Sequence, residues 1–387
     1  MKICVITPLF AIAGVPLAQI RFARALAARG HDVDLVIGYV DPKYELPDLP
    51  EVNVIRWGHQ FVRKMLLPFS AYLRRVKPDI VFSAEDHLNS IVLLAAILTR
   101  SKAKISGSSR VTPYNTYSNV PFTKRWVLKK LARAVMWRAD ALTCVSKDMV
   151  EQYHQVLQSQ RHVCVYNIVD DEKSRLRMNE PVDEDWLVHK QYPVLIAAGS
   201  LEPWKGFADL IQAVGELSQR KDVRLIILGD GSLRSELQEL VEIQKVSDRV
   251  KLLGHVENPL KYFRHADVFV LSSYVEGLPN VLVEAMMCGC TAVSNDCPTG
   301  PREVLQDGKY GYLVPMRDPD AMNVSSKGIL RAIATGKLVD PVAMAQGIEQ
   351  ALDNPISKEL LAQAVQPFEE SAVIKRHFEI LGLDETA

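Results

Sequence analysis

Short apolar runs alternate with longer amphipathic segments along the first half of the chain. The apolar runs are rich in Val, Ile and Leu, which is typical of buried strands in a parallel sheet. The segments between them carry apolar residues at helical spacing, so the alternation predicts a parallel sheet with right-handed crossovers. The expected strands are Ile3–Ile6, Val33–Ile37, Val52–Trp57, Ile80–Ser83, Ala103–Ser106 and Ala141–Val145, and the expected helices are Leu17–Arg29, Phe61–Val76, Asn89–Leu98 and Phe122–Arg138.

The same alternation restarts at about residue 192, after a charged stretch that contains proline. Residues 169–191 follow neither period and are interpreted as an interdomain linker. A chain of 387 residues suits two domains, which we place at 1–168 and 192–367. The expected strands of the second domain are Pro193–Gly199, Val223–Leu228, Val250–Leu253, Val268–Leu271, Thr291–Ser294 and Tyr312–Val314.

Two carboxylates stand on either side of one strand-to-helix junction in the second domain. Glu276 follows the buried run Val268–Leu271, and Glu284 lies one turn into the next helix, on the same face as Asn280. Ligands of open α/β sheets bind at the carboxyl ends of the strands. A helix N-terminus there favours an anion such as a diphosphate, and carboxylates on either side of it suit sugar hydroxyls.

The run from Glu276 to Glu284 has the form E-G-x-P-x-x-x-x-E, with Gly277 and Pro279 inside it. It resembles the signature of the retaining glycosyltransferases of family four, which have the GT-B fold. The resemblance implies an α/β protein in which two Rossmann-like domains face each other across a cleft. It further implies that 1–168 binds the acceptor, that 192–367 binds the nucleotide sugar, and that the terminal helix, 368–387, packs back on the first domain.

A second segment, Gly199 to Gly206, is similar to the G-R-L-x-x-x-K-G segment of this family. In the family its Lys and Arg grip the donor diphosphate. Lys205 matches the lysine and would offset the charge that grows on the leaving group. Ser200 stands where most members carry Arg, so one cation is missing, and Arg302 is a candidate substitute.

The resemblance gives the remaining site residues their roles. Glu276 and Lys205 are the expected catalytic pair, with Glu276 on the hydroxyls of the donor sugar and Lys205 on the diphosphate, while Glu284 would bind the ribose. Many relatives place a His near the sugar's 6-hydroxyl, and His87 is the nearest alternative here. The expected donor-contacting residues are Gly14, Ser200, Lys205, Gly231, Val256, Gly277, Leu278, Pro279, Asn280 and Glu284.

Charge is unevenly distributed although the net charge is zero. Residues 1–170 hold 23 Lys and Arg against 13 Asp and Glu, and the rest of the chain holds 23 against 33. The segment Phe122–Arg138 carries six cations and two Trp. This pattern fits a helix on an anionic membrane surface, and it equally fits a core helix with a solvated basic face.

Composition sets the remaining expectations. A hydrophobic content of 48% and a charged content of 24% are ordinary for a soluble protein. The apolar run after Met1 is too short for a signal peptide, and the scattered cysteines are interpreted as buried hydrophobes in a reducing cytosol. We expect no metal at Asp183–Asp185 or at the cysteines, no nicotinamide site, since G-x-G-x-x-G is missing, and no nucleic-acid partner.

Together these features predict a cytoplasmic, peripherally membrane-associated, retaining glycosyltransferase. It would move an N-acetylhexosamine or hexose from a UDP-sugar to a glycan or lipid-linked glycan in surface polysaccharide or lipopolysaccharide assembly, without a metal. Two alternatives remain: a GT-B sugar-nucleotide epimerase, which would turn over a UDP-sugar without an acceptor, and a non-catalytic UDP-sugar-binding subunit of a transferase complex. The stretch 322–340 is longer than the family pattern requires, and no role is assigned to it.

Overall fold

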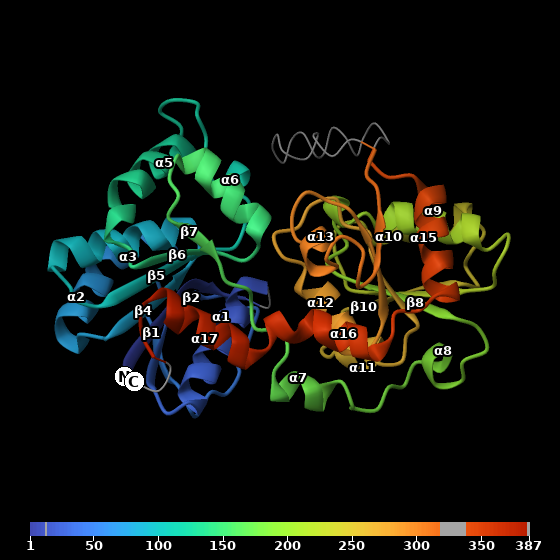
Figure 1. Ribbon diagram of the computed structural model, residues 1–387, viewed down its shortest axis with the longest axis horizontal. Coiled ribbons are helices and arrows are strands. Elements are labelled where there is room, and N and C mark those ends of the chain that lie inside the picture. Colours follow the sequence, from blue (N-terminus) through green and yellow to red (C-terminus); the bar gives the residue numbers. More distant parts are fainter. Residues whose placement is uncertain (12–13, 318–337, 385–387) are drawn as a thin grey trace. The chain divides into compact units, whose positions relative to one another are not determined.

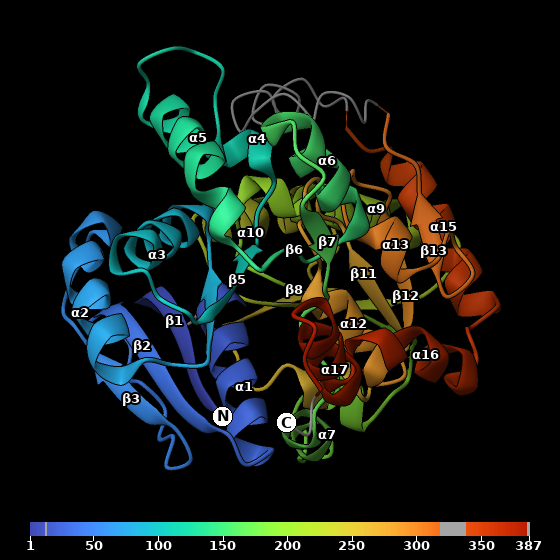
Figure 2. The ribbon, with the colours of Figure 1, turned by 60° about the vertical axis from the view of Figure 1, so that its left-hand side comes forward.

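The computed structural model describes residues 1–11, 14–317 and 338–384 of the chain. The chain divides into two compact units, which we call the first unit (Met1–Ile168 with Glu370–Ala387) and the second unit (Val169–Glu369). Most of the stretch 322–340 therefore lies outside the described residues. Figures 1 and 2 show a parallel sheet with helices on both faces in each unit.

Within its described residues, the first unit has a seven-stranded sheet in the order β3-β2-β1-β4-β5-β6-β7. All of its strands pair in parallel. The central strand β1 places Ile3 opposite Val33 on one side and opposite Ile80 on the other. The strands are β1 (Lys2–Phe10), β2 (Asp32–Val40), β3 (Asn53–Arg56), β4 (Ile80–Ala84), β5 (Lys104–Ser109), β6 (Ala141–Cys144) and β7 (His162–Cys164).

Helices α2, α3 and α5 lie along one face of this sheet, and α1 and α17 lie along the other (Figures 1 and 2). Strand order requires this arrangement, because right-handed crossovers that run in opposite directions from the centre place their helices on opposite faces. The helices are α1 (Gly14–Ala28), α2 (Leu66–Val76), α3 (Asp86–Thr99), α4 (Pro113–Thr116), α5 (Lys124–Val135), α6 (Lys147–Leu157) and α17 (Glu370–Ile380), with 3₁₀ turns at Val62–Met65 and Met136–Arg138.

The C-terminal helix α17 belongs to the first unit although it follows the second in sequence. Its Glu370 pairs with Arg29 at 2.5 Å. Its Phe378 stacks on His31 with ring centroids 5.5 Å apart. His377 is buried, and burial lowers the pKa of its imidazole to about 3. An aromatic core therefore ties the two ends of the chain together.

The second unit repeats the same architecture. Its described residues form a six-stranded parallel sheet in the order β10-β9-β8-β11-β12-β13. Helices α9, α10 and α15 lie on one face, and α11, α12 and α16 lie on the other. The strands are β8 (Val194–Ala198), β9 (Arg224–Leu228), β10 (Val250–Gly254), β11 (Val268–Leu271), β12 (Thr291–Asn295) and β13 (Tyr312–Val314).

The helices of the second unit include two in the segment that the sequence pattern assigns to a linker. Residues 169–191 belong to this unit and form α7 (Glu172–Arg177) and α8 (Asp185–Val188). Asp171 caps α7 by accepting from the Ser174 N–H at 2.6 Å, and Lys251 pairs with Glu184 at 2.5 Å. The other helices are α9 (Phe207–Leu217), α10 (Arg234–Ile243), α11 (Leu260–Phe263), α12 (Asn280–Met287), α13 (Pro301–Val304), α15 (Pro341–Asp353) and α16 (Lys358–Val365), with 3₁₀ turns at Pro203–Lys205 and Gln366–Phe368.

Candidate active site

The strand order of the second sheet reverses between β8 and β11. From β8 the chain moves outward through β9 to β10, and from β11 it moves the other way to β13. Loops that leave such neighbouring strands diverge and leave a crevice at the carboxyl edge. The loop after β8 carries Lys205, and the loop after β11 carries Glu276. The two residues that are expected to form the catalytic pair therefore lie in the two loops that start at the switch point of the sheet.

Lys205 and Glu276 meet directly. Lys205 Nζ lies 2.7 Å from Glu276 Oε1, and the two side chains are 19% and 13% exposed. An ion pair that remains partly open to solvent keeps both charges available to a ligand, while each holds the other in place. The pair joins positions that are 71 residues apart in sequence.

Gly206 allows the two loops to approach each other so closely. Its φ of 65° lies in the left-handed region, and a Cβ atom there would overlap the carbonyl oxygen of Ser272. Ser272 Oγ in turn donates to the Lys205 carbonyl at 2.7 Å, and the Tyr274 N–H donates to the Trp204 carbonyl at 2.9 Å. The backbone on either side of Lys205 is thus fixed against the loop that carries Glu276.

The end of β12 and the loop after it support the same site from the other side. Thr299 Oγ1 donates to the Glu276 carbonyl, and Asn295 Nδ2 donates to the Ser272 carbonyl at 2.6 Å. A Cβ at Gly300, whose φ is 89°, would lie 2.6 Å from Pro279 Cδ. Sequence reasoning gave Asn295, Thr299 and Gly300 no role. A polar residue and a glycine shortly after a buried strand were the only local signal that they might support a site.

Helix α12 begins directly after the loop that follows β11 and carries Glu276. Its N-cap is Pro279, and no side chain of the described residues caps it. The Asn280 N–H donates to the Leu278 carbonyl at 3.0 Å and the Leu282 N–H donates to the Pro279 carbonyl at 2.9 Å, and the positive end of the helix dipole lies at the carboxyl edge of the sheet. Leu278 is buried and anchors the turn. Glu284 lies half-buried one turn into the helix, four residues after Asn280. Burial, with a contribution from the Glu284 charge, raises the pKa of the Cys288 thiol to about 12.

Ser200, Gly231 and Val256 lie in the loops that follow β8, β9 and β10. These strands are neighbours, so the three positions fall along one stretch of the same edge. A Cβ at Gly231 would lie 2.6 Å from the Leu201 nitrogen, so the first two loops pack backbone to backbone. Ser200 is exposed. Its neighbour Glu202 accepts from Ser232 Oγ at 2.9 Å, which fixes the mouth of these loops.

Two family models match the chain. "Glycosyltransferase Family 4" covers residues 14–173, and "Glycosyl transferases group 1" covers residues 192–333. An uncharacterized glycosyltransferase of Methanocaldococcus jannaschii is 32% identical over 301 residues, which cover 69% of this chain and 73% of the relative. The chain belongs to the group 1, family 4 type of glycosyltransferases. The resemblance drawn from the E-x7-E run is thus confirmed.

Another relative of this glycosyltransferase has a named activity. N-acetylgalactosamine-N,N'-diacetylbacillosaminyl-diphospho-undecaprenol 4-alpha-N-acetylgalactosaminyltransferase of Campylobacter jejuni is 29% identical over 310 residues, which cover 77% of this chain and 82% of the relative. Among solved structures, Anabaena HepE in complex with UDP matches 99% of this chain and 100% of its own, with a TM-score of 0.70 and 19% identity. The structural match confirms the GT-B fold class of two Rossmann-like domains.

The structure brings most of the sequence-predicted site residues of this glycosyltransferase to one edge of the second unit, whereas Gly14 and His87 lie in the first unit. Gly14 begins α1 in the first unit, and a Cβ there would have no atom within 4 Å. Arg302 is 53% exposed and pairs with Asp296 and Asp307. These hydrogen bonds raise the pKa of its guanidinium. Arg302 is therefore held by two carboxylates and does not fill the place left by Ser200 in this structure.

Across the described ranges, no group of three or more His, Cys, Asp and Glu side chains is placed to hold a metal ion. The acidic run Asp183–Asp185 is dispersed, with Glu184 on Lys251 and Asp185 on His189. None of the helices in the described part of the chain is both long enough and apolar enough to cross a bilayer.

Proposed function

We propose that this family member is a retaining glycosyltransferase that moves an N-acetylhexosamine or hexose from a UDP-sugar to a glycan or lipid-linked glycan in surface polysaccharide or lipopolysaccharide assembly. The observation that carries the proposal is the Lys205–Glu276 pair at the switch point of the second sheet. An ammonium group and a carboxylate held together there match the two ends of a sugar diphosphate, one anionic and one rich in hydroxyls.

On donor binding, Lys205 and Glu276 would separate and contact different parts of the UDP-sugar. Lys205 would turn to the diphosphate and neutralise charge that grows as the glycosidic bond breaks. Glu276 would accept hydrogen bonds from hydroxyls of the donor sugar, and charged acceptors make stronger bonds than neutral ones. Glu284 would take the ribose, and the uncapped start of α12 between them would face the diphosphate. Because Lys205 and the positive end of the α12 dipole supply positive charge, we propose that no metal is needed.

The names of similar proteins support the choice of donor and acceptor. The Campylobacter jejuni relative is named for an N-acetylgalactosaminyl group and for a diphospho-undecaprenol-linked acceptor. The Anabaena protein of like fold was solved with UDP. UDP-N-acetylgalactosamine and a diphospho-undecaprenol-linked glycan are therefore the first pair to test.

The first experiment is a thermal-shift panel followed by a transfer assay. UDP-sugars at a hundredfold their dissociation constant should stabilise the fold by about 2.7 kcal/mol, while GDP- and ADP-sugars should not. Transfer with net retention requires an α-linked product from an α-linked donor, which NMR of the anomeric proton reports. A β-linked product would contradict retention. Epimerisation without an acceptor would support the epimerase instead, and binding without any turnover would support the non-catalytic subunit.

A lipid-linked acceptor would place the enzyme at a membrane, and helix α5 of the first unit suits an anionic surface. Only Ala132 and Val135 of α5 are buried. Phe122, just before it, is 90% exposed, and Trp137, just after it, is 61% exposed. An exposed row of cations flanked by exposed aromatic side chains is typical of interfacial helices. We therefore propose peripheral binding to the cytoplasmic face of the membrane through this helix.

The structure shows which cations to change in a test of membrane binding. Arg125 donates to the carbonyls of Tyr114 and Tyr117, so its loss would disturb the loop before α5. Within the described residues, Lys124 and Lys130 make no hydrogen bond to a backbone carbonyl, although Lys130 lies over the Trp126 ring.

Lys124→Gln with Lys130→Gln should weaken binding to phosphatidylserine vesicles by roughly 1 kcal/mol per charge. Lys375→Gln with Arg376→Gln on α17 removes the same charge elsewhere in the first unit and should change binding little. Equal loss in both double variants would show that net charge, not helix α5, governs the attraction. Unchanged binding in both would exclude α5 as the docking element.

A further inference from the structure

A second group of polar side chains lies at the carboxyl edge of the first unit's sheet. Glu85 follows β4, His87 lies in the first turn of α3, and Arg110 follows β5. His87 Nε2 is 3.3 Å from Glu85 Oε2. Strand β4 adjoins β1, where the order of this sheet reverses, so the group stands where a ligand crevice is expected. We call Glu85, His87 and Arg110 the β4-edge cluster.

The backbone at Glu85 is held in a conformation that side chains disfavour. Its φ is 78° and its ψ is 131°, a region that glycine enters far more readily than any residue with a Cβ. The Glu85 N–H donates to the Ser108 carbonyl at 2.9 Å, and its own carbonyl accepts from the Asn89 N–H at 2.8 Å. Strain of this kind gathers at functional sites, where the surrounding fold imposes it. A carboxylate thus stands where glycine would cost less.

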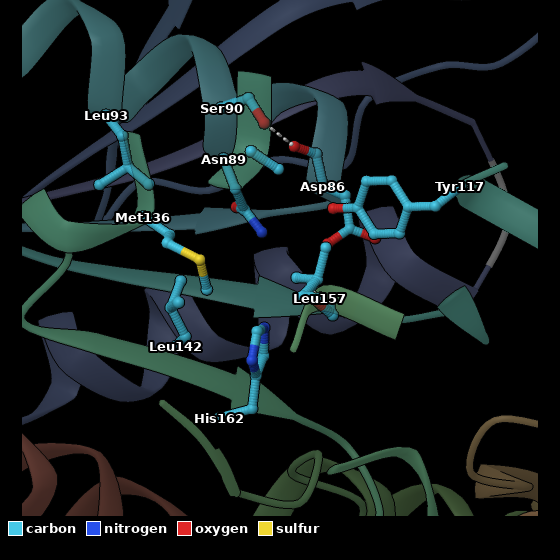
Figure 3. Close-up of a pocket in the computed structure, with 11 residues that line it drawn as sticks. Asp86, Asn89, Ser90, Leu93, Tyr117, Met136, Leu142, Leu157 and His162 are labelled. Atoms are coloured by element: carbon cyan, nitrogen blue, oxygen red, sulfur yellow. Dashed lines mark hydrogen bonds between the residues drawn. The ribbon is translucent and has the colours of Figure 1, made fainter. Parts of the chain in front are cut away.

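The neighbouring Asp86 supplies the anchor. It is buried and accepts from Tyr153 Oη at 2.5 Å and from Ser109 Oγ at 2.7 Å. Tyr117 adds a further hydrogen bond, and Figure 3 shows its ring beside the Asp86 carboxylate. The cavity behind has a volume of about 20 Å³, room for a single water molecule. Because these hydrogen bonds fix Asp86, its neighbours in sequence, Glu85 and His87, are held at the carboxyl edge of the sheet.

The charges of the cluster favour a neutral hydroxyl ligand over a phosphate. Burial lowers the pKa of His87, so its ring is neutral at pH 7. Arg110 is then the one cation of the cluster, beside the carboxylates of Glu85 and Asp86. Above pH 7, where Glu85 is ionised, a phosphate would meet this carboxylate beside a single cation, Arg110. A hydroxyl can donate a hydrogen bond to Glu85, whose side chain is open to solvent, while Arg110 Nε is buried beside it and has no hydrogen-bond partner among the described residues.

We propose that the β4-edge cluster binds a hydroxyl group of the acceptor glycan and that Glu85 is the residue that selects it. This inference rests on the proposed function, because it assigns the acceptor side of the same transfer reaction. Glu85 is 30% exposed and His87 is 43% exposed, so both side chains are open to a ligand while the backbone beneath them is fixed. Arg110 is steadied by donating to Asn167.

The cluster carries a pH signature. Burial raises the pKa of Glu85 to about 7. The negative charge of Asp86 raises this pKa further, and the positive charge of Arg110 lowers it in part. Ionised Glu85 accepts a hydrogen bond from the acceptor's hydroxyl, so the acceptor KM should fall as pH rises through 7. Stability should change in the opposite sense. A raised carboxyl pKa means that the folded state binds a proton more tightly, so this contribution to stability is lost as pH rises from the unfolded pKa toward 7.

The test compares Glu85→Gln with Glu379→Gln, a matched change at an exposed carboxylate of α17 in the same unit. The probes are octyl α-N-acetylgalactosaminide, which has no phosphate, and N-acetylgalactosaminyl-diphospho-undecaprenol, each with UDP-N-acetylgalactosamine. Glu85→Gln should raise the KM for either acceptor at least tenfold at pH 8 and flatten its pH dependence, with the donor KM unchanged. Glu379→Gln should behave as the parent protein.

A second readout keeps the inference testable if transfer by the variant is too slow to measure. The thermal midpoint of Glu85→Gln relative to the parent should rise between pH 5 and 7 and then level off. Glu85→Gly should fold at least as stably as Glu85→Gln, since it relieves the positive φ, and should bind the acceptor no better.

The remaining outcomes distinguish failure of this inference from failure of the proposed function. An unchanged acceptor KM in Glu85→Gln would overturn the inference while leaving the proposed function intact. Use of the diphosphate-linked acceptor alone by the parent protein would also overturn it, since the cluster would then not suffice for a neutral glycan. Failure of the parent protein with every donor and acceptor would instead contradict the proposed function itself.

Discussion

The carboxyl edges of the two sheets differ in how they hold a carboxylate-bearing loop beside the point where the strand order reverses. Each sheet reverses its strand order once, and each carries a carboxylate in a loop beside that point, Glu276 in the second unit and Glu85 in the first. In the second unit, glycines absorb the unusual backbone geometry, as Gly206 and Gly300 show. In the first unit, Glu85 itself takes the positive φ.

The difference lies in what holds each site. Loops of the second unit are held by contacts between backbones, which require glycine at fixed positions and so leave a sequence motif. The β4-edge cluster is held from below by Asp86 and the hydroxyls that bond to it. Such a network can be assembled from several residue types at scattered positions. The site at the edge of the second unit can therefore be predicted from a sequence motif, whereas the β4-edge cluster can be identified only from the tertiary structure.

The largest expected effect concerns the ion pair of the second unit. Glu276→Gln should lower the transfer rate by about 10- to 100-fold, or about 1.5–3 kcal/mol, because charged hydrogen bonds to the donor sugar are lost. Lys205→Ala should cost at least as much, because the charge it offsets grows in the transition state. Steady-state kinetics measures both.

The control is Glu239→Gln, at an exposed position on α10. Parental rates in folded Glu276→Gln and Lys205→Ala variants would place the chemistry elsewhere. The double variant should lose less than the sum of the two single losses, since the residues contact each other.

Next is the close approach of the loops at Gly206. Gly206→Ala should lower the free energy of unfolding by about 1–3 kcal/mol or more, because a Cβ at this left-handed position overlaps the Ser272 carbonyl. Gly58→Ala is the matched control, with a φ of 72° and no atom within 4 Å of the added Cβ. Denaturant unfolding measures both. Equal losses would mean that φ alone, and not the contact between loops, matters at Gly206.

A smaller effect is expected at Glu284. Glu284→Gln should weaken donor binding by about 0.5–1.5 kcal/mol, roughly two- to tenfold, because one charged hydrogen bond with the ribose is replaced by a neutral one to the amide oxygen. The ribose is remote from the bond that breaks, so kcat should hardly change. Calorimetric titration with UDP together with kcat separates the two quantities. A fall in kcat with unchanged UDP affinity would contradict the ribose assignment.

The smallest effect is expected at Arg302. Arg302→Ala removes exposed pairs with Asp296 and Asp307, and exposed pairs contribute about 0–1 kcal/mol. Donor affinity should stay within about threefold of the parent value, by the same titration. A loss of donor affinity above tenfold would show that Arg302 exchanges Asp296 and Asp307 for the diphosphate. Arg302 would then replace the arginine that most family members carry at the position of Ser200.

Sequence periodicity alone was enough to place most of the strands and the two-domain organisation. Consecutive apolar residues mark β1, β4, β8 and β11, and such runs indicate strands that are buried on both faces of the sheet. It was insufficient for β7 (His162–Cys164), which is too short to show a period. The predicted helices Phe61–Val76 and Phe122–Arg138 have 3₁₀ turns at their ends, because helix termini are set by local hydrogen bonds.

The candidate site divides in the same manner. The sequence by itself determined that Glu276, Glu284 and Lys205 belong to loops and a helix at strand ends, because spacing along the chain decides which element each residue occupies. Only the tertiary structure decided that Lys205 touches Glu276, that Arg302 is taken by two carboxylates, and that Asp86 holds Glu85 in a strained backbone. These contacts depend on strand order and on loops that meet across many residues of sequence, and no local pattern encodes such a meeting.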